Sequence, residues 1–276
     1  MKIAACVVLY NPDIKCLDNI NSYYSLVDCL YVLDNSDCYN SKLIELLTEK
    51  KNVEYINLGG NQGIAYALKV GLQKSVETQF DLCLTMDQDS IFPTISRTDL
   101  ENKILKVDLE QYGIIGLNIN SSDKEDEIVE VKYWLTSGNF IVLNNYKKIH
   151  GVREELFIDY VDFDLNQQFD QINKKVAYWR DLSLIHQIGN PKKYNFFGVK
   201  FTVLNHAPIR YYYRFRNARY LYLRNKKFFR KLYFHDLCID IPKIILFEKQ
   251  KRLKLRLIKK GRKDAKKGIL GKYETN

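Results

Sequence analysis

The feature that most constrains the fold is a strict alternation of short apolar runs with helical patterns in residues 1–90. The apolar runs span residues 3–9, 29–33, 53–57 and 80–86. Between them, apolar side chains recur at the spacing of one helix face: Leu17, Ile20 and Tyr24, then Leu43, Leu46 and Leu47, then Ile64, Ala67, Leu68 and Leu72. Strands that are separated by helices pair in parallel, so the pattern predicts a doubly wound α/β sheet.

A polar motif follows each of the four runs: YNPD at 10–13, DNSD at 34–37, GGNQG at 59–63 and DQDS at 87–90. Doubly wound sheets bind their ligands beyond the carboxyl ends of the strands. We therefore expect the four motifs to meet at one edge of the sheet.

Asp87 and Asp89 lie one residue apart at the end of the fourth run. An extended backbone points alternate side chains to the same side, so both carboxylates would aim at one point. Two carboxylates that close repel each other unless a cation lies between them. Mg²⁺ is commonly held by one or two carboxylates together with substrate phosphates. The alternative for an isolated Asp-x-Asp is a solvated turn.

Beyond residue 95 the alternation loosens. A helix is expected near residues 97–107, strands near 113–117, 131–135 and 140–143, and a solvated acidic loop at 121–130. The segment ELFIDYVDFDLNQQF at 155–169 combines core-forming residues with Asp159, Asp162 and Asp164, which can face a cleft. From about residue 207 the chain becomes helical, aromatic and basic.

Charge divides the chain into two parts. Residues 1–209 contain 21 Lys and Arg against 28 Asp and Glu, whereas residues 210–276 contain 22 against 5. Such asymmetry points to an appendage that meets an anionic surface, either nucleic acid or acidic lipid.

Apolar runs and cysteine spacing predict where in the cell the protein is located. No run of 18 apolar residues occurs, so no single helix is expected to span a bilayer. The apolar stretch in MKIAACVVLYNPD is too short for a signal-peptide core and is typical of a first buried strand. The six cysteines include no C-x-x-C pair, so neither disulfides nor structural zinc are expected. We expect a cytoplasmic protein.

The motifs YNP, LDNSD, GGNQGIAYALKVGL and MDQDS, in this order, resemble the family 2 glycosyltransferases, and in particular their bacterial rhamnosyltransferase-type members. Later motifs agree, namely SGN at 137–139, FIDYVDFDL at 157–165, IHQIG at 185–189 and RYYYRFRN at 210–217. The resemblance covers about residues 3–225. It implies an A-type glycosyltransferase fold, a single Rossmann-like nucleotide-binding domain with a mixed central sheet, over residues 1–209. Residues 210–276 would form a basic helical appendage.

For the donor nucleotide, Tyr10, Asn11 and Asp34 can supply a stacking wall and hydrogen bonds. The resemblance places Asp34 on the base or ribose and Asn61 on the donor. Gly63 and its neighbouring glycines permit a tight turn with positive φ, and the helix N-terminus that follows favours negative charge. A turn that only caps the helix is the alternative.

The resemblance implies that Asp87 and Asp89 bind Mg²⁺ or Mn²⁺ and the donor diphosphate. The ion would neutralise the departing nucleoside diphosphate. His186 resembles the late histidine of the family, which helps to hold the metal or the diphosphate. A histidine beside apolar residues also fits a satisfied core position, and this alternative stays open.

The acceptor hydroxyl needs a general base, for which a carboxylate is the usual choice. Asp162 aligns best with the catalytic aspartate of the family. Val161 stands where the family often has Glu, so Asp159 is kept as the second candidate. Arg210 and Arg216 are expected to contact a diphosphate, because Arg suits bidentate phosphate binding. A solvated basic helix is the alternative for both arginines.

The function implied is a metal-dependent, inverting transfer of L-rhamnose from dTDP-rhamnose to a saccharide acceptor, expected to be lipid-linked, in cell-surface polysaccharide synthesis. Inversion is implied by the family alone. A UDP-sugar donor, with transfer of galactofuranose, galactose or glucose, is the alternative.

Other classes fit less well. A nucleotidyltransferase would carry a Gly-rich loop with Arg and Lys after the first strand, and YNPD is not such a loop. A phosphatase of the Asp-x-Asp type would place its nucleophile after the first strand, whereas this pair follows the fourth. A nucleic-acid-binding protein would explain the basic tail but not the four motifs. No nucleic-acid partner is therefore expected.

The basic tail combines apolar stripes with positive charge. The stripes are Phe228, Phe229, Leu232 and Tyr233, then Ile241, Ile244, Ile245 and Phe247. The stretch KQKRLKLRLIKKGRKDAKK at 249–267 follows, with 11 Lys and Arg among 19 residues. A basic amphipathic helix lies in the membrane interface, so we expect the chain at the anionic inner face of the cell membrane. A solvated, partly disordered tail is the alternative.

Overall fold

The computed structural model describes residues 1–186, 192–196, 199–203 and 205–274. These form two compact units, of which the first contains residues 1–154 and 161–186. The second contains residues 155–160 together with the described residues after 186. The division therefore comes earlier in the chain than the expected boundary at residue 209, and it assigns a short segment before residue 161 to the second unit.

The first unit follows the predicted alternation through its first four strands. Its strands are β1 (Ile3–Leu9), β2 (Cys29–Asp34), β3 (Val53–Asn57), β4 (Leu82–Asp87), β5 (Ser90–Ile91), β6 (Tyr112–Ile119), β7 (Ile128–Val131), β8 (Asn139–Val142) and β9 (Lys175–His186). Its helices are α1 (Cys16–Tyr24), α2 (Ser41–Thr48), α3 (Ile64–Glu77), α4 (Arg97–Leu105), α5 (Leu143–Tyr146) and α6 (Val161–Gln171). Two short 3₁₀ turns are η1 (Leu109–Gln111) and η2 (Glu154–Leu156).

The strands form one mixed sheet in the order β3-β2-β1-β4-β8-β6-β9-β5, with β7 also paired to β9. β1 pairs in parallel with β2 and β4, and β2 pairs in parallel with β3. β8 runs antiparallel to β4 and β6, which makes the sheet mixed. This is the α/β architecture that the sequence predicts, with the carboxyl ends of β1 to β4 at one edge.

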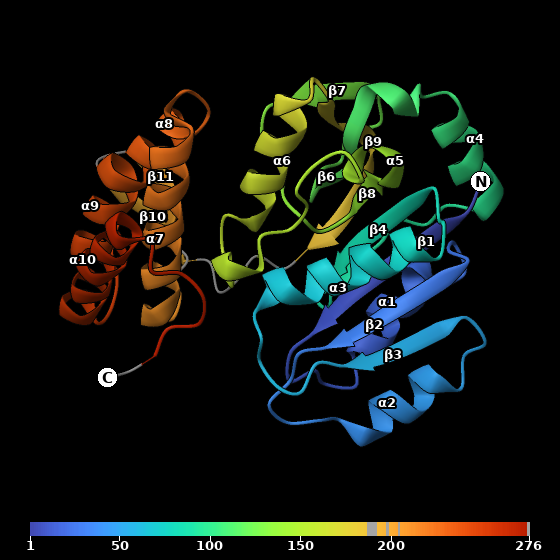
Figure 1. Ribbon diagram of the computed structural model, residues 1–276, viewed down its shortest axis with the longest axis horizontal. Coiled ribbons are helices and arrows are strands. Elements are labelled where there is room, and N and C mark those ends of the chain that lie inside the picture. Colours follow the sequence, from blue (N-terminus) through green and yellow to red (C-terminus); the bar gives the residue numbers. More distant parts are fainter. Residues whose placement is uncertain (187–191, 197–198, 204, 275–276) are drawn as a thin grey trace. The chain divides into compact units, whose positions relative to one another are not determined.

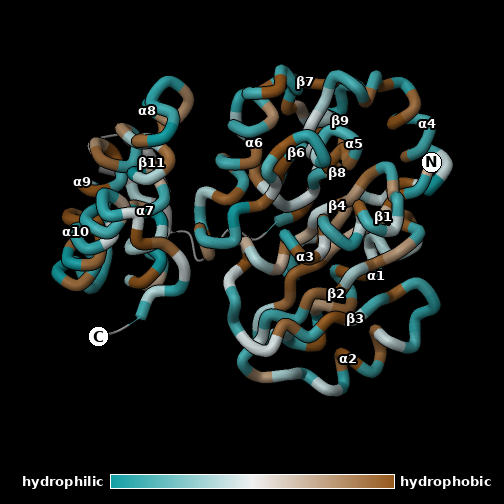
Figure 2. The backbone as a smooth tube through the Cα atoms, viewed as in Figure 1, coloured by the Kyte–Doolittle hydropathy of each residue, from teal (hydrophilic) through white to brown (hydrophobic). Residues whose placement is uncertain are grey.

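Helices cover both faces of the parallel strands, which is why every residue of β1 is buried. Apolar residues of α1, α2 and α4 pack with alternate residues of β1 in the main core. On the other face α3 crosses the strands (Figure 1), and it does so at very close range. A Cβ atom on Gly71 would lie 2.7 Å from Cys6 Cβ and 2.8 Å from Leu33 Cδ1. Figure 2 shows the hydrophobic residues that run along these central strands.

One predicted strand is misplaced. The sequence favours a strand at 131–135, but β7 ends at Val131 and pairs with β9. After β7, Trp134 packs through its ring and does not extend the strand: it stacks on Tyr178 with ring centroids 4.1 Å apart and an interplanar angle of 3°. Part of the predicted acidic loop is therefore strand, and part of the predicted strand is loop.

The second unit is largely helical. It contains β10 (Lys192–Phe196) paired antiparallel with β11 (Val199–Val203), then α7 (Pro208–Arg224), α8 (Lys226–His235), the π-helical turn η3 (Asp236–Asp240), α9 (Ile241–Phe247) and α10 (Lys251–Lys267). Residues 210–274 are thus ordered and helical for most of their length. Among the described residues, none of the helices combines the length and the apolar character needed to cross a membrane.

The basic helix α10 packs against α7 through a glycine. A Cβ atom on Gly261 would lie 2.4 Å from the backbone oxygen of Tyr212, so only glycine permits this approach. Lys254 of α10 is buried and donates to Glu248, with Nζ 2.7 Å from Oε2. Glu248 also accepts a hydrogen bond from the hydroxyl of Tyr211. The basic tail is therefore a folded element that has its own buried polar contacts.

Candidate active site

The four polar motifs meet at the carboxyl edge of β1 to β4, as predicted. The backbone N–H of Tyr10 donates to Gln88 Oε1 at 2.7 Å, which joins the first motif to the fourth. The hydroxyl of Tyr10 donates to Asp37 Oδ2 at 3.1 Å. The backbone N–H of Asn61 donates to Asp37 Oδ1 at 3.2 Å, which joins the second motif to the third. Hydrogen bonds within the edge thus connect residues from four separate parts of the sequence.

The residues expected to bind the nucleotide base lie at different depths. Tyr10 is 44% exposed, and Asn11 is exposed with a left-handed φ of 44°. Asp34 is fully buried and accepts a hydrogen bond from the hydroxyl of Tyr55 at 2.7 Å. Burial and this hydrogen bond raise the pKa of Tyr55. Asp34 therefore lies beneath the edge, and Asp37 is the exposed carboxylate above it.

The glycine-rich turn has the predicted conformation. Gly59, Gly60 and Gly63 have φ values of 74°, 103° and 89°, a region that residues with a side chain rarely adopt. The backbone N–H of Gly63 donates to Asn61 Oδ1 at 3.1 Å. Helix α3 begins directly after Gly63. Its N-terminus lies at the same edge and favours a negatively charged ligand.

Asp87, Asp89 and His186 lie together. Each offers a ligand atom, and these atoms lie within 4.8 Å of one another. The pairing of β5 with β9 sets Ser90 opposite His186 and so brings the histidine beside the aspartates. His186 Nδ1 lies 3.4 Å from Asp89 Oδ1.

Two serines hold this group in place. Ser90 Oγ lies 2.7 Å from His186 Nδ1 and 2.8 Å from Ser137 Oγ. The hydroxyl of Ser137 also accepts a hydrogen bond from the backbone N–H of Asp87 at 3.1 Å. The hydrogen bond to Asp89 raises the pKa of His186, burial opposes this rise, and the charges of Asp89 and Asp87 add to it. The histidine thus lies in a field that attracts a cation.

The donor atoms fit a divalent metal ion. Carboxylate oxygens are the preferred ligands of Mg²⁺, and a set that adds an imidazole also suits transition metals such as Mn²⁺. Asp89 is half exposed, so a ligand can approach the group from solvent. Asp87, Asp89 and His186 are therefore the residues that could hold the ion.

Asp162 lies in the same unit, in the first turn of α6. It is half-buried, and its Oδ1 accepts the backbone N–H of Phe163 at 2.9 Å. Together with Thr85 and Asn139 it lines a small cavity of about 10 Å³. Thr85 precedes Asp87 by two residues on β4, so both side chains lie on one face of that strand. The cavity thus connects the surroundings of Asp162 to the strand that carries Asp87.

The other predicted residues lie in the second unit. Asp159 is held by Arg210, whose Nη2 lies 2.6 Å from Oδ1 and whose Nε lies 3.3 Å from Oδ2. Arg216 is fully buried, and its guanidinium donates to the carbonyl oxygens of Leu156 and Gly271. The expected contact of Arg216 with a diphosphate has no support in this arrangement. The residues of IHQIG after His186 lie outside the described residues.

Four further residues of this edge were not predicted as site residues from the sequence: Asp37, Gln88, Ser90 and Ser137. Asp37 is the last residue of DNSD, and its position after the turn is the signal that could have identified it as the exposed acid. Ser90 and Ser137 lie within quoted motifs, but their contacts depend on the pairing of β5 with β9 and on the loop before β8. Such long-range pairing leaves no local pattern in the sequence.

Known proteins resemble this chain in sequence and in fold. No protein-family model matches the chain. The chain is 28% identical over 243 residues, 81% of its own length and 80% of the relative, to the dTDP-rhamnosyl transferase RfbF of Shigella flexneri. Its fold resembles crystal structures of S. aureus TarS residues 1–349, alone and in complex with UDP-GlcNAc, both with a TM-score of 0.60, 13% identity and coverage of 96% of this chain and 81% of the other.

A second similar structure is that of GalNAc-T7 with UDP, GalNAc and Mn²⁺. It has a TM-score of 0.64 and 11% identity, and the match covers 97% of this chain and 56% of that protein. These structures establish the A-type glycosyltransferase fold. The match to the rhamnosyl transferase, joined with the four motifs that converge at the sheet edge, shows that the chain is similar to the glycosyltransferases of family 2.

Proposed function

We propose that the chain transfers L-rhamnose from dTDP-rhamnose to a saccharide acceptor, with inversion at the anomeric carbon. The observation that carries the proposal is the group of Asp87, Asp89 and His186 at the edge where the four motifs meet. The name of the 28% identical relative supports rhamnose as the sugar and dTDP as the nucleotide. The sheet edge offers separate features for the base, the diphosphate and the acceptor.

Each feature has a role that follows from its chemistry. The exposed ring of Tyr10 offers a stacking surface for the base, and Asp37 beside it is an acceptor for hydrogen bonds from the base or ribose. The N-terminus of α3 and Asn61 face the charge of the diphosphate. When bound to Asp87, Asp89 and His186, Mg²⁺ or Mn²⁺ would neutralise the departing nucleoside diphosphate.

Asp162 is the proposed general base. It would take the proton of the acceptor hydroxyl as that oxygen forms a bond to the anomeric carbon and the bond from this carbon to the diphosphate breaks. Asp159 is the weaker candidate, because both of its carboxylate oxygens are held by Arg210. A carboxylate whose two oxygens already accept hydrogen bonds from a guanidinium is less accessible to an acceptor hydroxyl.

A donor panel tests the function. Purified protein is supplied with Mg²⁺ or Mn²⁺, a lipid-linked acceptor extract and, in turn, dTDP-rhamnose, UDP-galactofuranose, UDP-galactose and UDP-glucose, and the released nucleotide is measured. We expect release from dTDP-rhamnose that depends on both the metal and the acceptor. Release from a UDP-sugar alone would move the donor to the UDP class. Intact donors throughout would refute the proposal.

We further propose that the acceptor is carried on a lipid and that the second unit docks at the inner face of the cell membrane. The corner between α9 and α10 supports this docking, because Ile245, Leu246 and Leu253 are 45%, 58% and 43% exposed. Lys249, Lys251 and Arg252 line the shallow hollow at the same corner. Apolar side chains that are surrounded by cations suit an anionic interface, where each basic residue contributes about 1 kcal/mol.

Liposome co-sedimentation tests this docking. The double variant Leu246→Ser/Leu253→Ser removes exposed side chains only, so the fold should persist. Leu105→Ser, on α4 of the first unit, is the matched control because Leu105 is 73% exposed. We expect binding of wild-type protein and of the control to anionic but not neutral vesicles, and weaker binding of the double variant. Binding by none of the three proteins would remove the membrane role, and equal binding by all three would show that the corner between α9 and α10 is not the docking surface.

A further inference from the structure

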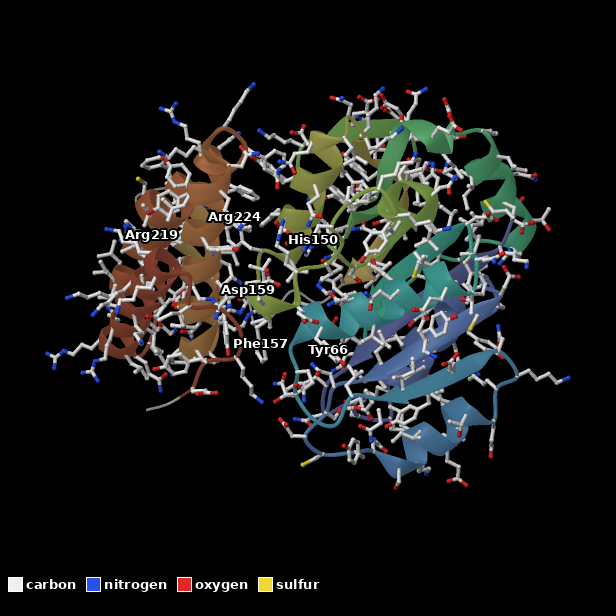
Figure 3. The ribbon with its side chains drawn as sticks, viewed as in Figure 1. Tyr66, His150, Phe157, Asp159, Arg219 and Arg224 are labelled. Carbon is white, nitrogen blue, oxygen red and sulfur yellow. The ribbon has the colours of Figure 1, made fainter. Side chains whose placement is uncertain are left out.

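The segment Glu155–Tyr160, which directly precedes α6, has an unusual backbone. Phe157, Asp159 and Tyr160 have φ values of 65°, 65° and 69°, although none of them is glycine. L-residues with large side chains rarely adopt this region, and such strain persists only where the surroundings impose it. Figure 3 labels Phe157 and Asp159 on this segment.

Asn217 of α7 supplies much of that constraint. It is fully buried, and its Nδ2 donates to three backbone oxygens, those of Leu156 at 2.9 Å, Ile158 at 2.9 Å and Asp159 at 2.8 Å. Its Oδ1 accepts a hydrogen bond from Arg216 Nε at 2.9 Å, which fixes the orientation of the amide. One side-chain amide therefore spans most of the strained segment.

Further contacts from the same helix hold the side chains of the segment. Arg210 grips the carboxylate of Asp159 with two hydrogen bonds. The ring of Phe157 stacks on Tyr213, with centroids 4.8 Å apart and an interplanar angle of 19°. Arg216 adds hydrogen bonds to the backbone oxygens of the segment.

The end of the segment is held as well. The hydroxyl of Tyr160 donates to Asp236 at 2.8 Å, and Asp236 is in turn held by Arg214. The motif RYYYRFRN thus touches or supports the segment from its first residue to its last. This arrangement gives the motif a use other than contact with a diphosphate.

We infer that Asn217 and Arg216 are positioning residues for Asp162. Tyr160 is followed by Val161, the first residue of α6, and Asp162 is the next residue. The backbone that Asn217 and Arg216 hold is therefore the backbone from which the helix of the proposed base starts. The inference rests on the proposed role of Asp162 in transfer. It predicts that loss of the hydrogen bonds from Asn217 and Arg216 to this backbone lowers turnover without weakening the binding of nucleotide.

The test compares two buried substitutions in the full-length protein. Asn217→Leu keeps the size of the side chain and removes its amide. Ile258→Ala, in the small core between α7, α9 and α10, is the control, because it loosens the second unit without touching the segment. For each protein we would measure kcat for transfer, Kd for dTDP in the presence of Mn²⁺, and hydrogen exchange of the amides between residues 155 and 162.

We expect kcat of Asn217→Leu to fall by about 10²-fold relative to Ile258→Ala, the scale of a small misplacement of a catalytic group. The Kd for dTDP should stay within about twofold, because the nucleotide edge is built from other motifs. Amide exchange at 155–162 should accelerate in Asn217→Leu alone.

A loss of kcat no larger than that of Ile258→Ala would overturn the inference and leave the proposed function intact. So would a rise in the Kd for dTDP that matches the loss of kcat, because it would assign the motif to the diphosphate. If wild-type protein transferred no sugar, the proposed function would fall and the positioning role with it. Faster exchange in Asn217→Leu would then show only that the amide holds the segment.

Discussion

The two compact units use their acidic side chains in opposite ways. In the first unit, Asp37 and Asp89 are exposed at the edge where the motifs meet. In the second unit, Glu248 is buried and accepts a hydrogen bond from the equally buried Lys254. Asp37 and Asp89 are thus accessible to a ligand, although Asp34 beneath the same edge is buried, whereas Glu248 holds helices together. Because residues 210–276 contain 22 Lys and Arg against 5 Asp and Glu, the surface of the second unit is mostly positive.

Each unit also contains a group of side chains of the kinds that bind metal ions. These are Asp87, Asp89 and His186 in the first unit, and His235, Asp236 and Asp240 in the second. Arg214 donates to both aspartates of the second group and carries a fixed positive charge there. The first group has His186, whose charge depends on a proton that a metal ion can replace. The presence of ligand-type residues is therefore a weak guide until the cation beside them is known.

The largest effect is expected from Glu248→Gln. The side chains of Glu248 and Lys254 are 5% and 2% exposed, so the substitution leaves a buried ammonium without its counter-charge. The free energy of unfolding should fall by about 3–5 kcal/mol, as when one partner of a buried ion pair is lost. Urea denaturation measures this. The control, Lys69→Gln, breaks the partly exposed ion pair with Glu154 in the first unit and should lower the free energy of unfolding by less than about 1 kcal/mol. Equal losses of stability in the two variants would contradict the contrast between the units.

Next in size is the effect of Asp162→Asn on turnover. Loss of the proton acceptor should lower kcat by about 10²-fold or more. Isothermal titration with dTDP and Mn²⁺ should give an unchanged affinity, since Asp162 is not among the metal-ligand group. Asp159→Asn is the comparison variant. It loses the ion pair with Arg210 while Asn217 and Arg216 still hold the backbone, so it should retain more turnover than Asp162→Asn. The opposite result, with only Asp159→Asn inactive, would move the base to Asp159.

A smaller effect is expected on the binding of dTDP in the presence of Mn²⁺. Even partners outside the first ligand sphere contribute about tenfold to metal affinity, so Asp89→Asn should weaken this binding by at least that factor. Asp240→Asn changes the corresponding group of the second unit, where Arg214 already occupies the aspartates, and should leave nucleotide binding unchanged. Equal weakening by the two variants would remove the distinction between the groups.

The smallest effect is the difference in stability between two glycine-to-alanine variants, one in each unit. In Gly261→Ala the new Cβ meets a backbone oxygen at 2.4 Å, whereas in Gly71→Ala it meets side-chain atoms of Cys6 and Leu33 at 2.7 and 2.8 Å. The overlap is closer at Gly261, so Gly261→Ala should be less stable than Gly71→Ala by about 1 kcal/mol, at the low end of overpacking costs. Thermal unfolding of the two variants gives the difference. A larger loss for Gly71→Ala would indicate that the sheet of the first unit is the more rigid partner.

Features that repeat locally could be predicted from the sequence. The runs at 3–9 and 53–57 coincide with β1 and β3. β1 is buried along its whole length and has a continuous apolar pattern, whereas β3 at the end of the sheet is only half-buried. The meeting of the four motifs at one edge followed from parallel pairing alone. The grouping of His186 with Asp87 and Asp89 needed the family resemblance, since His186 lies 97 positions after Asp89 in the sequence.

Features that depend on distant partners could not be predicted. Arg216 lies in a basic, aromatic stretch that is typical of an exposed helix, yet it is fully buried beneath the backbone of residues 155–160. A local pattern does not distinguish an arginine that binds a ligand from one that binds carbonyl oxygens. For the same reason the sequence could not assign residues 155–160 to the second unit.

The pairing of Ser90 with His186 also bears on the order in which the protein matures. The DQDS motif, which contains Asp87 and Asp89, leaves the ribosome long before His186 is synthesised. The strand β5 is only two residues long and pairs with β9, so few contacts hold β5 before β9 is present. β5 can pair only after residues 185 and 186 have been synthesised, whereas β1 to β4 lie within the first 87 residues. During synthesis, the nascent chain therefore carries the two aspartates for many residues before the histidine can join them.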